Sequence, residues 1–366
     1  MLSGGNASNI SIDSCYKFSN KQFDIAFYAK MCMDSLGIAV CLAVMTVIIL
    51  SKAYKRFVFR LVIYFIVADI FQAITHIIEL TPVEVVNGEV VVKEGADAVC
   101  AFYGFLDQLA LWMGNVAIIW IMLYLLWLVH GLRKIQKGVR YQNSEISLKT
   151  EMLGLFFLLV FPLSFNWIPF VWDMYGISGL WCWIKESRDI CHDYDLGLSL
   201  IFSMYYGPLM VIVTFTFISL MAITSILCKG AVNKNGVARR TYSRGTRDTV
   251  LIAIYPVVYS LICLVAIANR IYSAVNGSKG KEPFFPLWFA HTIAEPARVL
   301  IPPIAFLLHP NSWKTMYKLG SSRNYRPTSH TASIHIPRED SDIESSIVIP
   351  RSPPRIELYG AIIEVK

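Results

Sequence analysis

The chain has 366 residues, of which 55% are hydrophobic and only 16% are charged. Soluble domains carry about 25% charged residues, so the composition excludes the pair of soluble domains that the length alone would allow. Apolar residues dominate between residues 28 and 309, whereas residues 320–366 are polar and rich in Ser, Pro and charge. We therefore expect a multi-pass helical membrane protein. The net charge of +7 is then a property of its loops and does not indicate nucleic-acid binding.

Seven charge-poor runs are long enough to cross a bilayer, which requires roughly 17–25 apolar residues per helix. They are continuously apolar, whereas a membrane barrel shows alternating stretches of about ten residues. Because no run alternates like a strand, we predict an all-α bundle of seven transmembrane helices. The predicted spans are residues 28–50, 58–80, 98–129, 151–172, 195–228, 247–272 and 286–309.

The segments outside the spans have patterns of their own. Residues 1–27 are expected to form a tail. Residues 310–319 place Trp313 and Lys314 on opposite sides of a short helix, which suits the membrane interface. Residues 320–366 have the composition of a disordered tail. Phosphorylation of this tail would add negative charge suited to an arrestin-type partner, the alternative being an inert polar tail. The candidate positions are Ser329, Thr331, Ser333, Ser341, Ser345, Ser346 and Ser352.

The basic residues predict the orientation of the bundle, because cytoplasmic loops are enriched in Lys and Arg. Alternate loops hold 15 such residues (51–60, 130–150 and 229–248) against 6 (81–97, 173–195 and 270–285). With seven spans, the N-terminus is then outside and the C-terminus inside. Three glycosylation sequons fall on the predicted outside, at Asn6, Asn9 and Asn276. The first 27 residues lack an apolar core, so we expect no cleaved signal peptide.

Eight cysteines divide into two groups by predicted position. Those in or at the ends of helices are expected to pack in the core, and they are Cys32, Cys41, Cys228 and Cys263. Those on the oxidising side are Cys15, Cys100, Cys182 and Cys191. Four cysteines allow three pairings. We favour a bond between Cys100 and Cys182, because it would hold the outer loop over the bundle. Cys191 could instead compete for Cys100, or it could pair with Cys15.

Seven spans, an outer N-terminus and a cysteine pair between the third helix and an outer loop resemble a G-protein-coupled receptor. The nearer resemblance, over roughly residues 28–320, is to the slime-mould cyclic-AMP receptors and the related fungal nutrient sensors. It rests on the loop Tyr-Gly-Ile-Ser-Gly-Leu-Trp-Cys-Trp-Ile at 175–184, on Tyr255-Pro256-Val257-Val258-Tyr259, on Asn269-Arg270-Ile271 and on Ala68-Asp69. The adjacent Cys182 and Trp183 are also similar to secretin-type receptors.

The sequence departs from the rhodopsin class in two places. The third span ends without an acidic-Arg-aromatic triplet, and the seventh lacks an Asn-Pro-x-x-Tyr motif. The rhodopsin-class switch therefore cannot be carried over. In its place we consider Asp69, Tyr255, Pro256 and Asn269 as switch candidates. Asp69 could bind an ion or serve in activation, or it could form a structural hydrogen bond between helices.

The resemblance implies an extracellular small-molecule or peptide ligand and a heterotrimeric G protein, with a signal that could be linked to cyclic AMP. It places the G protein at the basic inner ends of the helices. The residues expected there are Arg133, Lys134, Arg239, Arg240 and Arg244. The simpler interpretation of these charges is topology together with attraction to anionic membrane lipid.

Polar side chains within the spans are candidates for a ligand pocket, because charge inside a membrane is costly. On the third span, Asp107, Gln108, Trp112 and Asn115 form a polar and aromatic stripe facing the bundle. Asp107 could contact a cationic ligand, or it could pair with a base such as Arg270 or Arg298.

The second and seventh spans add further candidates. His76 and Glu79 lie one turn apart and are expected at a pocket rim or in a snorkelling contact. His291, Glu295 and Arg298 share a face, and the last two are spaced to pair with each other. Alternatively, His291 or Arg298 could bind an anionic ligand. Trp181 and Trp183 flank Cys182 and are predicted to form a lid.

Rival functional classes lack their motifs. There is no metalloprotease, nucleophile-elbow or phosphate-loop signature, so we expect no enzyme, no metal and no cofactor. Residues 286–309 contain no lysine that could hold retinal. A secondary transporter, which would show internal repeats with interrupted helices, is the alternative. We predict a G-protein-coupled receptor of the plasma membrane.

Overall fold

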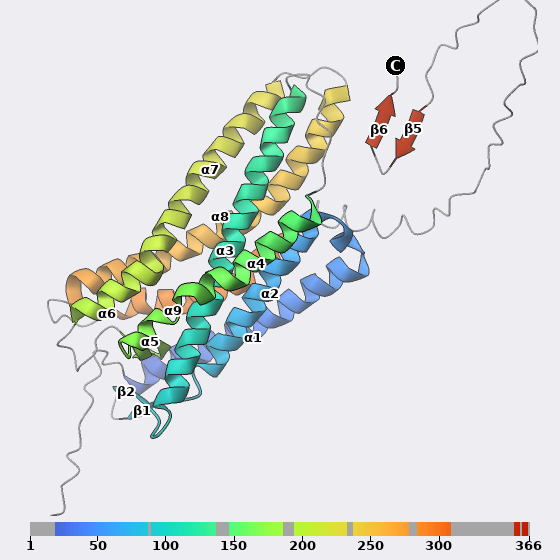
Figure 1. The fold of residues 1–366 in the computed structure, drawn as a ribbon. Helices are drawn as coiled ribbons and strands as arrows, with labels where there is room; N and C mark the ends of the chain where they lie inside the picture. The colour runs from blue at the N-terminus through green and yellow to red at the C-terminus, as the bar shows by residue number, and fades with distance from the viewer. Residues whose placement is uncertain are drawn as a thin grey trace, which may run out of the picture. The chain divides into compact units, whose positions relative to one another are not determined.

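The computed structural model describes residues 19–86, 89–136, 146–185, 194–232, 237–277 and 284–308, together with two short segments, 355–358 and 361–364. Its long helices form a bundle (Figure 1). They are α1 (Asn20–Leu50), α2 (Phe57–Ile78), α3 (Asp97–Gln136), α4 (Leu148–Phe165), α7 (Gly207–Val232), α8 (Val237–Gly277) and α9 (Phe285–Leu308). The shorter pieces are η1 (Ala53–Lys55), α5 (Ile168–Val171), α6 (Tyr194–Ile201) and the π-helix η2 (Phe202–Tyr206).

The predicted fold class is confirmed. Within the described residues, six helical segments are long and apolar enough to cross a membrane, and they correspond to the first six predicted spans. The fifth of them combines α6, η2 and α7. The seventh predicted span corresponds to α9, a helix of 24 residues that contacts α1, α2 and α8 and carries Glu295 and Arg298. It is not among those six helices, so its crossing of the membrane stays a prediction. The chain is a multi-pass membrane protein.

The first helix begins earlier than the sequence predicted. Helix α1 starts at Asn20, so residues 20–27 belong to it rather than to the expected tail. Ser19 caps this start: its hydroxyl accepts a hydrogen bond from the Gln22 amide, and the Gln22 side chain accepts one from the Ser19 amide. Two charged residues of this helix, Lys30 and Asp34, are buried against neighbouring helices. Their charge is compensated inside the bundle, which a hydropathy count does not detect.

A proline organises the fifth span. Pro208 has no amide hydrogen, so it cannot donate to the carbonyl of Met204 one turn earlier. The backbone widens here into the π-helix η2. The Met204 carbonyl instead accepts hydrogen bonds from Trp112 at 3.0 Å and from Gln108 at 3.4 Å, both on α3. The widened turn joins the fifth span to the third and leaves Tyr205 and Tyr206 buried.

Two β-hairpins lie in loops between the predicted spans, outside the apolar runs for which no strand was expected. Strands β1 (Val83–Val86) and β2 (Glu89–Val92) pair antiparallel, as do β3 (Tyr175–Ser178) and β4 (Trp181–Ile184). The first hairpin had a sequence signal, Asn87-Gly88 between valine-rich runs. In the second, Gly179 adopts φ +71°, which glycine tolerates in a tight turn. The strands have only four residues each, so an analysis that looks for long apolar runs does not detect them.

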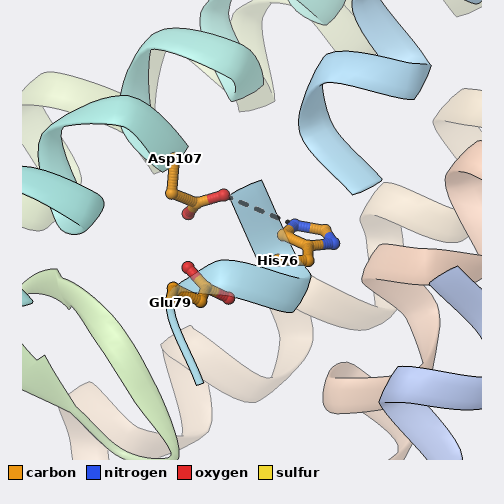
Figure 2. A group of neighbouring side chains, drawn as sticks. All are labelled: His76, Glu79 and Asp107. Carbon is orange, nitrogen blue, oxygen red and sulfur yellow. Dashed lines mark ion pairs between the residues drawn. The ribbon is translucent and has the colours of Figure 1, made fainter. Parts of the chain in front are cut away.

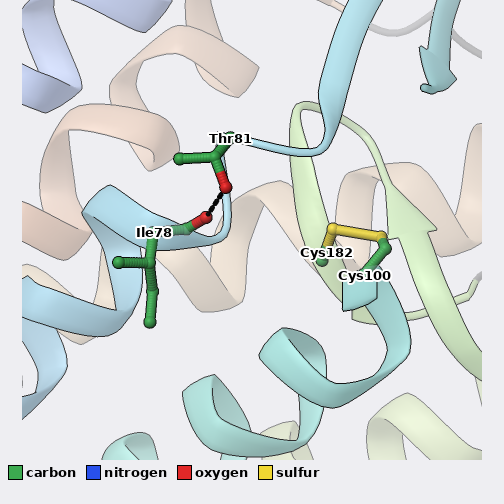
Figure 3. Close-up of a disulfide and its surroundings, with 4 residues drawn as sticks. All are labelled: Ile78, Thr81, Cys100 and Cys182. Carbon is green, nitrogen blue, oxygen red and sulfur yellow. Dashed lines mark hydrogen bonds between the residues drawn. A yellow bond between two sulfur atoms is a disulfide. The ribbon is translucent and has the colours of Figure 1, made fainter. Parts of the chain in front are cut away.

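The disulfide between Cys100 and Cys182 is present and fixes the second hairpin to the bundle. It joins the beginning of α3 to β4, with a Cα–Cα distance of 5.2 Å (Figure 3). Beside it, the Thr81 hydroxyl donates to the Ile78 carbonyl at 2.7 Å and satisfies the end of α2. We call this end of the bundle, with β1 to β4 and the disulfide, the hairpin end.

The other cysteine predictions have mixed outcomes. Cys41 and Cys263 are buried, as expected for core packing, whereas Cys32 and Cys228 are exposed on the surface of their helices. Cys15 and Cys191 lie outside the described residues, so their pairing stays a prediction.

The C-terminal region is a separate unit. The predicted interfacial helix at 310–319 lies outside the described residues, as do the phosphorylation candidates. Within the tail predicted to be disordered, the structure describes β5 (Arg355–Leu358) and β6 (Ala361–Glu364), which pair antiparallel from Arg355 opposite Glu364.

A close approach between α3 and β4 leads to a stability prediction. A Cβ atom at Gly104 would lie 3.0 Å from the Trp183 Cα atom, which belongs to backbone, whereas one at Gly114 would meet nothing closer than 3.9 Å. Gly→Ala favours a helix by about 1 kcal/mol when space allows. We therefore expect Gly104→Ala to be less stable than Gly114→Ala by about 1–3 kcal/mol, the usual cost of overpacking. Thermal unfolding of both variants in detergent would measure this, and equal midpoints would contradict it.

Candidate functional site: a buried ionic cluster

A lysine on α1 lies inside the bundle near its hairpin end. Lys30 is completely buried. Its ammonium nitrogen is 3.3 Å from a carboxylate oxygen of Glu79 and 3.7 Å from one of Glu295. It also lies 5.2 Å from the ring centroid of Trp181. Burying an unpaired ammonium is strongly unfavourable, so the two carboxylates and the aromatic face make this position possible.

His76 on α2 connects three helices. Its Nδ1 is 3.1 Å from Asp34 Oδ1 on α1, and its Nε2 is 3.4 Å from Asp107 Oδ1 on α3 (Figure 2). The amide nitrogen of Gln72 lies 3.3 Å from the same Nε2. His76 and Glu79 are both fully buried. The expected snorkelling contact is therefore wrong: these side chains point into the bundle because their partners are there.

His291 on α9 joins the same group. Its Nε2 lies 3.3 Å from Glu295 Oε1 and 3.3 Å from the Tyr206 hydroxyl, and its Nδ1 is 3.0 Å from the Asn269 amide nitrogen. Glu295 therefore contacts His291 with one oxygen and Lys30 with the other. Asn269, a switch candidate on α8, is here a neighbour of the cluster.

These side chains form one unit that we call the ionic cluster, and its members are Lys30, Asp34, His76, Glu79, Asp107, His291 and Glu295. It holds four carboxylates but a single permanent cation, Lys30. Unless histidines or carboxyl groups of the cluster are protonated, it carries an excess of negative charge in a dry interior. Such an excess is unfavourable without a further positive group.

Arg298 lies in a layer of tyrosines. Its guanidinium donates to the hydroxyls of Tyr205 at 3.0 Å and Tyr259 at 3.2 Å, and Tyr259 in turn donates to the Asn115 side-chain oxygen. The expected pairing of Arg298 with Glu295 is wrong, because Glu295 contacts Lys30 and the histidines instead. Nothing in the described residues hydrogen-bonds Nε or Nη2 of this arginine.

The hairpin tryptophans are buried, since each is only 2% exposed, and their role as a lid stays a prediction. The Trp183 indole donates to Gln108 at 2.7 Å, and the Arg270 guanidinium lies 5.4 Å from the Trp183 ring centroid. Trp181 meets His291 edge to face. Asp107 pairs with neither candidate arginine and has His76 as its contact.

The remaining switch candidates, Asp69, Tyr255 and Pro256, are not members of the ionic cluster. Both carboxylate oxygens of Asp69 are buried and receive no hydrogen bond from the part of the chain that the structure describes. The expected hydrogen bond between helices is therefore not formed there. Tyr255 packs its ring against Phe65 and Phe306. Pro256 lies inside α8.

The predicted G-protein face and the sequons are described only in part. Arg133 and Lys134 are exposed in the last turn of α3. Asn276 is half-buried near the end of α8. Arg239, Arg240 and Arg244 belong to α8, but their side chains lie outside the described residues, and so do Asn6 and Asn9.

Several residues of the site were missed. Lys30 and Asp34 lie within the predicted first span but were not among the candidates, although a lysine and an aspartate one turn apart in an otherwise apolar run are a signal. Tyr205 and Tyr206 follow Met204 just before Pro208, where a distorted helix could have been expected. Arg60 of α2 also pairs with Glu151 of α4, at 2.7 Å and 2.9 Å, away from the ionic cluster.

The described helices form a membrane bundle with a rhodopsin-like fold. The chain is similar to the crystal structure of squid rhodopsin, with a TM-score of 0.53 and 14% sequence identity over 81% of this chain and 85% of that one. At this identity the likeness shows the fold. No family model and no curated protein sequence matches the chain.

Proposed function

We propose that this chain is a plasma-membrane receptor that transmits an extracellular ligand signal to heterotrimeric G proteins. The observation that carries the proposal is the rhodopsin-like bundle with a buried ionic cluster at its hairpin end. In such a bundle, a change at one end can reach the other through rigid helices. The cluster contains residues of α1, α2, α3 and α9, so a ligand that alters its charge would act on several helices together.

The residues suit a ligand that approaches from the hairpin end. Trp181 and Trp183 lie between the disulfide and the charged groups, with Lys30 and Arg270 against their rings. Ligand binding beneath the hairpin would favour a displacement of α8 that the free protein already samples. The resemblance to cyclic-AMP receptors supports testing anionic ligands at Arg270 and Arg298, while the carboxylate excess supports testing cationic ones.

A secondary transporter is the second candidate, supported by the prolines and charged residues of α9. Its fold would be expected to show internal repeats around a central site. The rhodopsin-like arrangement favours the receptor.

The receptor proposal is tested by G-protein activation in cells that display equal amounts of each variant at the surface. A panel of cyclic nucleotides, sugars, amines and carboxylates would be applied to the unchanged chain, to Asp107→Asn and to Arg298→Gln. We expect activation by at least one compound, reduced at least tenfold in potency by one of the two changes. Glu84→Gln, on the exposed face of β1, is the matched control and should respond normally. Solute uptake without coupling to any α-subunit would contradict the proposal.

A further inference from the structure

We propose that His76, Glu79 and Asp107 bind a divalent transition-metal ion at the hairpin end of the bundle. One imidazole nitrogen and two carboxylate oxygens from these residues all lie within 4.8 Å of one another, and all three residues are buried. The site does not depend on the proposed receptor function, because it is inferred from the donor atoms alone.

The three donors converge from two helices. His76 and Glu79 are three residues apart at the end of α2, which places them on one face, and Asp107 faces them from α3. Figure 2 shows the carboxylates of Glu79 and Asp107 turned toward each other with the imidazole beside them. Both oxygens of Glu79 and Oδ1 of Asp107 are buried and receive no hydrogen bond from any described residue. Facing carboxylates repel each other in a dry interior, so the arrangement favours a cation between them.

The surroundings of His76 match those of a metal ligand. A metal-bound histidine usually donates its second ring N–H to a carboxylate, which orients the ring. Asp34 lies 3.1 Å from Nδ1 and can accept that hydrogen bond. The lone pair of Nε2 then faces Asp107, whose Oδ1 is 3.4 Å away. The Gln72 amide nitrogen lies 3.3 Å from Nε2 on another side, and a bound metal ion would supply the positive group that stabilises the two facing lone pairs.

The spacing of the donor atoms suits a metal ion. Bonds of about 2.1 Å in tetrahedral geometry place the donors of a zinc site about 3.4 Å apart, which is the separation of His76 Nε2 and Asp107 Oδ1. The ligand oxygen of Glu79 lies within 4.8 Å of both of these atoms.

The donor set also selects among metals. Imidazole suits zinc, cobalt and similar ions, whereas calcium and magnesium prefer oxygen alone. Three protein ligands leave one position open for water or another donor. Lys30, 3.3 Å from Glu79 Oε1, keeps Glu295 as a second partner at 3.7 Å. Glu79 can therefore bind the ion through one oxygen while Lys30 stays paired.

The experiment measures metal binding rather than signalling, so its failure is distinct from failure of the receptor proposal. The purified full chain in detergent would be stripped with a chelator and titrated with Zn²⁺, Co²⁺ and Ca²⁺. We expect Zn²⁺ to raise the unfolding midpoint reversibly, Co²⁺ to give a visible absorption band, and Ca²⁺ to have little effect. Glu79→Gln and Asp107→Asn should abolish the response, and Asp34→Asn should weaken Zn²⁺ affinity about 10- to 100-fold.

Glu84→Gln is the control, because it neutralises an exposed carboxylate of β1 outside the three ligands, and it should bind Zn²⁺ normally. If a neutral variant does not fold, X-ray absorption of the Zn²⁺-loaded unchanged chain decides, with one imidazole and otherwise oxygen ligands expected. Sulfur ligands, unchanged binding in both ligand variants, or a folded protein that ignores Zn²⁺ but is stabilised by a small amine would each overturn the proposal.

Discussion

Replacing Lys30 by methionine is expected to lower the free energy of unfolding by about 3–5 kcal/mol, the usual cost of removing one partner from a buried ion pair. Methionine fills much of the same space, so the effect is electrostatic. Glu79 and Glu295 would lose their shared ammonium at 3.3 Å and 3.7 Å and remain buried. No other permanent cation belongs to the ionic cluster. Thermal unfolding in detergent, with loss of the monomer peak in size-exclusion chromatography, would measure the change.

A second substitution separates charge from packing. The double variant Lys30→Met with Glu79→Gln removes the stranded carboxylate together with the ammonium, and it should recover part of the lost stability. Lys21→Met is the matched control, since Lys21 lies on the same helix but is exposed, and it should change stability by less than about 0.5 kcal/mol. If the double variant were less stable than Lys30→Met alone, the loss of stability in Lys30→Met would not come from the unpaired Glu79 carboxylate.

The bundle itself could be predicted from the sequence because membrane spans are fixed by a simple physical requirement, a long apolar stretch without exposed backbone polar groups. The stretches around Asp69 and Asp107 remained recognisable because single charges hardly change the mean hydropathy. Lys30 and Asp34 show where that reasoning ends. A count of apolar residues does not indicate which charged side chains are paired inside the bundle, and in the structure these two are partners of Glu79 and His76.

The partners within the site depend on distances that no single segment encodes. The sequence placed Glu295 and Arg298 one turn apart and suggested that they pair. The structure directs Glu295 toward α1 and α2, and Arg298 toward Tyr205 and Tyr259. Which side of α9 meets which helix is decided by the packing of the whole bundle. The sequence therefore indicated which polar residues lie inside the bundle, but it did not indicate which side chains they contact.

Cys182→Ser is expected to remove about 2–4 kcal/mol of stability, the typical contribution of a disulfide, and to reduce delivery to the cell surface. The bond closes a long loop, with 82 residues of sequence separation, and holds β4 against α3. Its loss would free the strand that carries Trp181 and Trp183, whose rings lie against Lys30 and Arg270. Damage should therefore reach the ionic cluster as well. Surface labelling and the unfolding midpoint would measure the two effects.

A disulfide predicts that the effects of the two cysteine substitutions are not additive. Because one bond needs both sulfurs, Cys100→Ser should match Cys182→Ser, and the double variant should be no worse than either single one. Cys228→Ser provides the control, since this cysteine is free and exposed on α7, and it should leave both readouts unchanged. If the loss of the double variant equalled the sum of the single losses, the two sulfurs would contribute to stability independently. That result would contradict a stabilising disulfide between them.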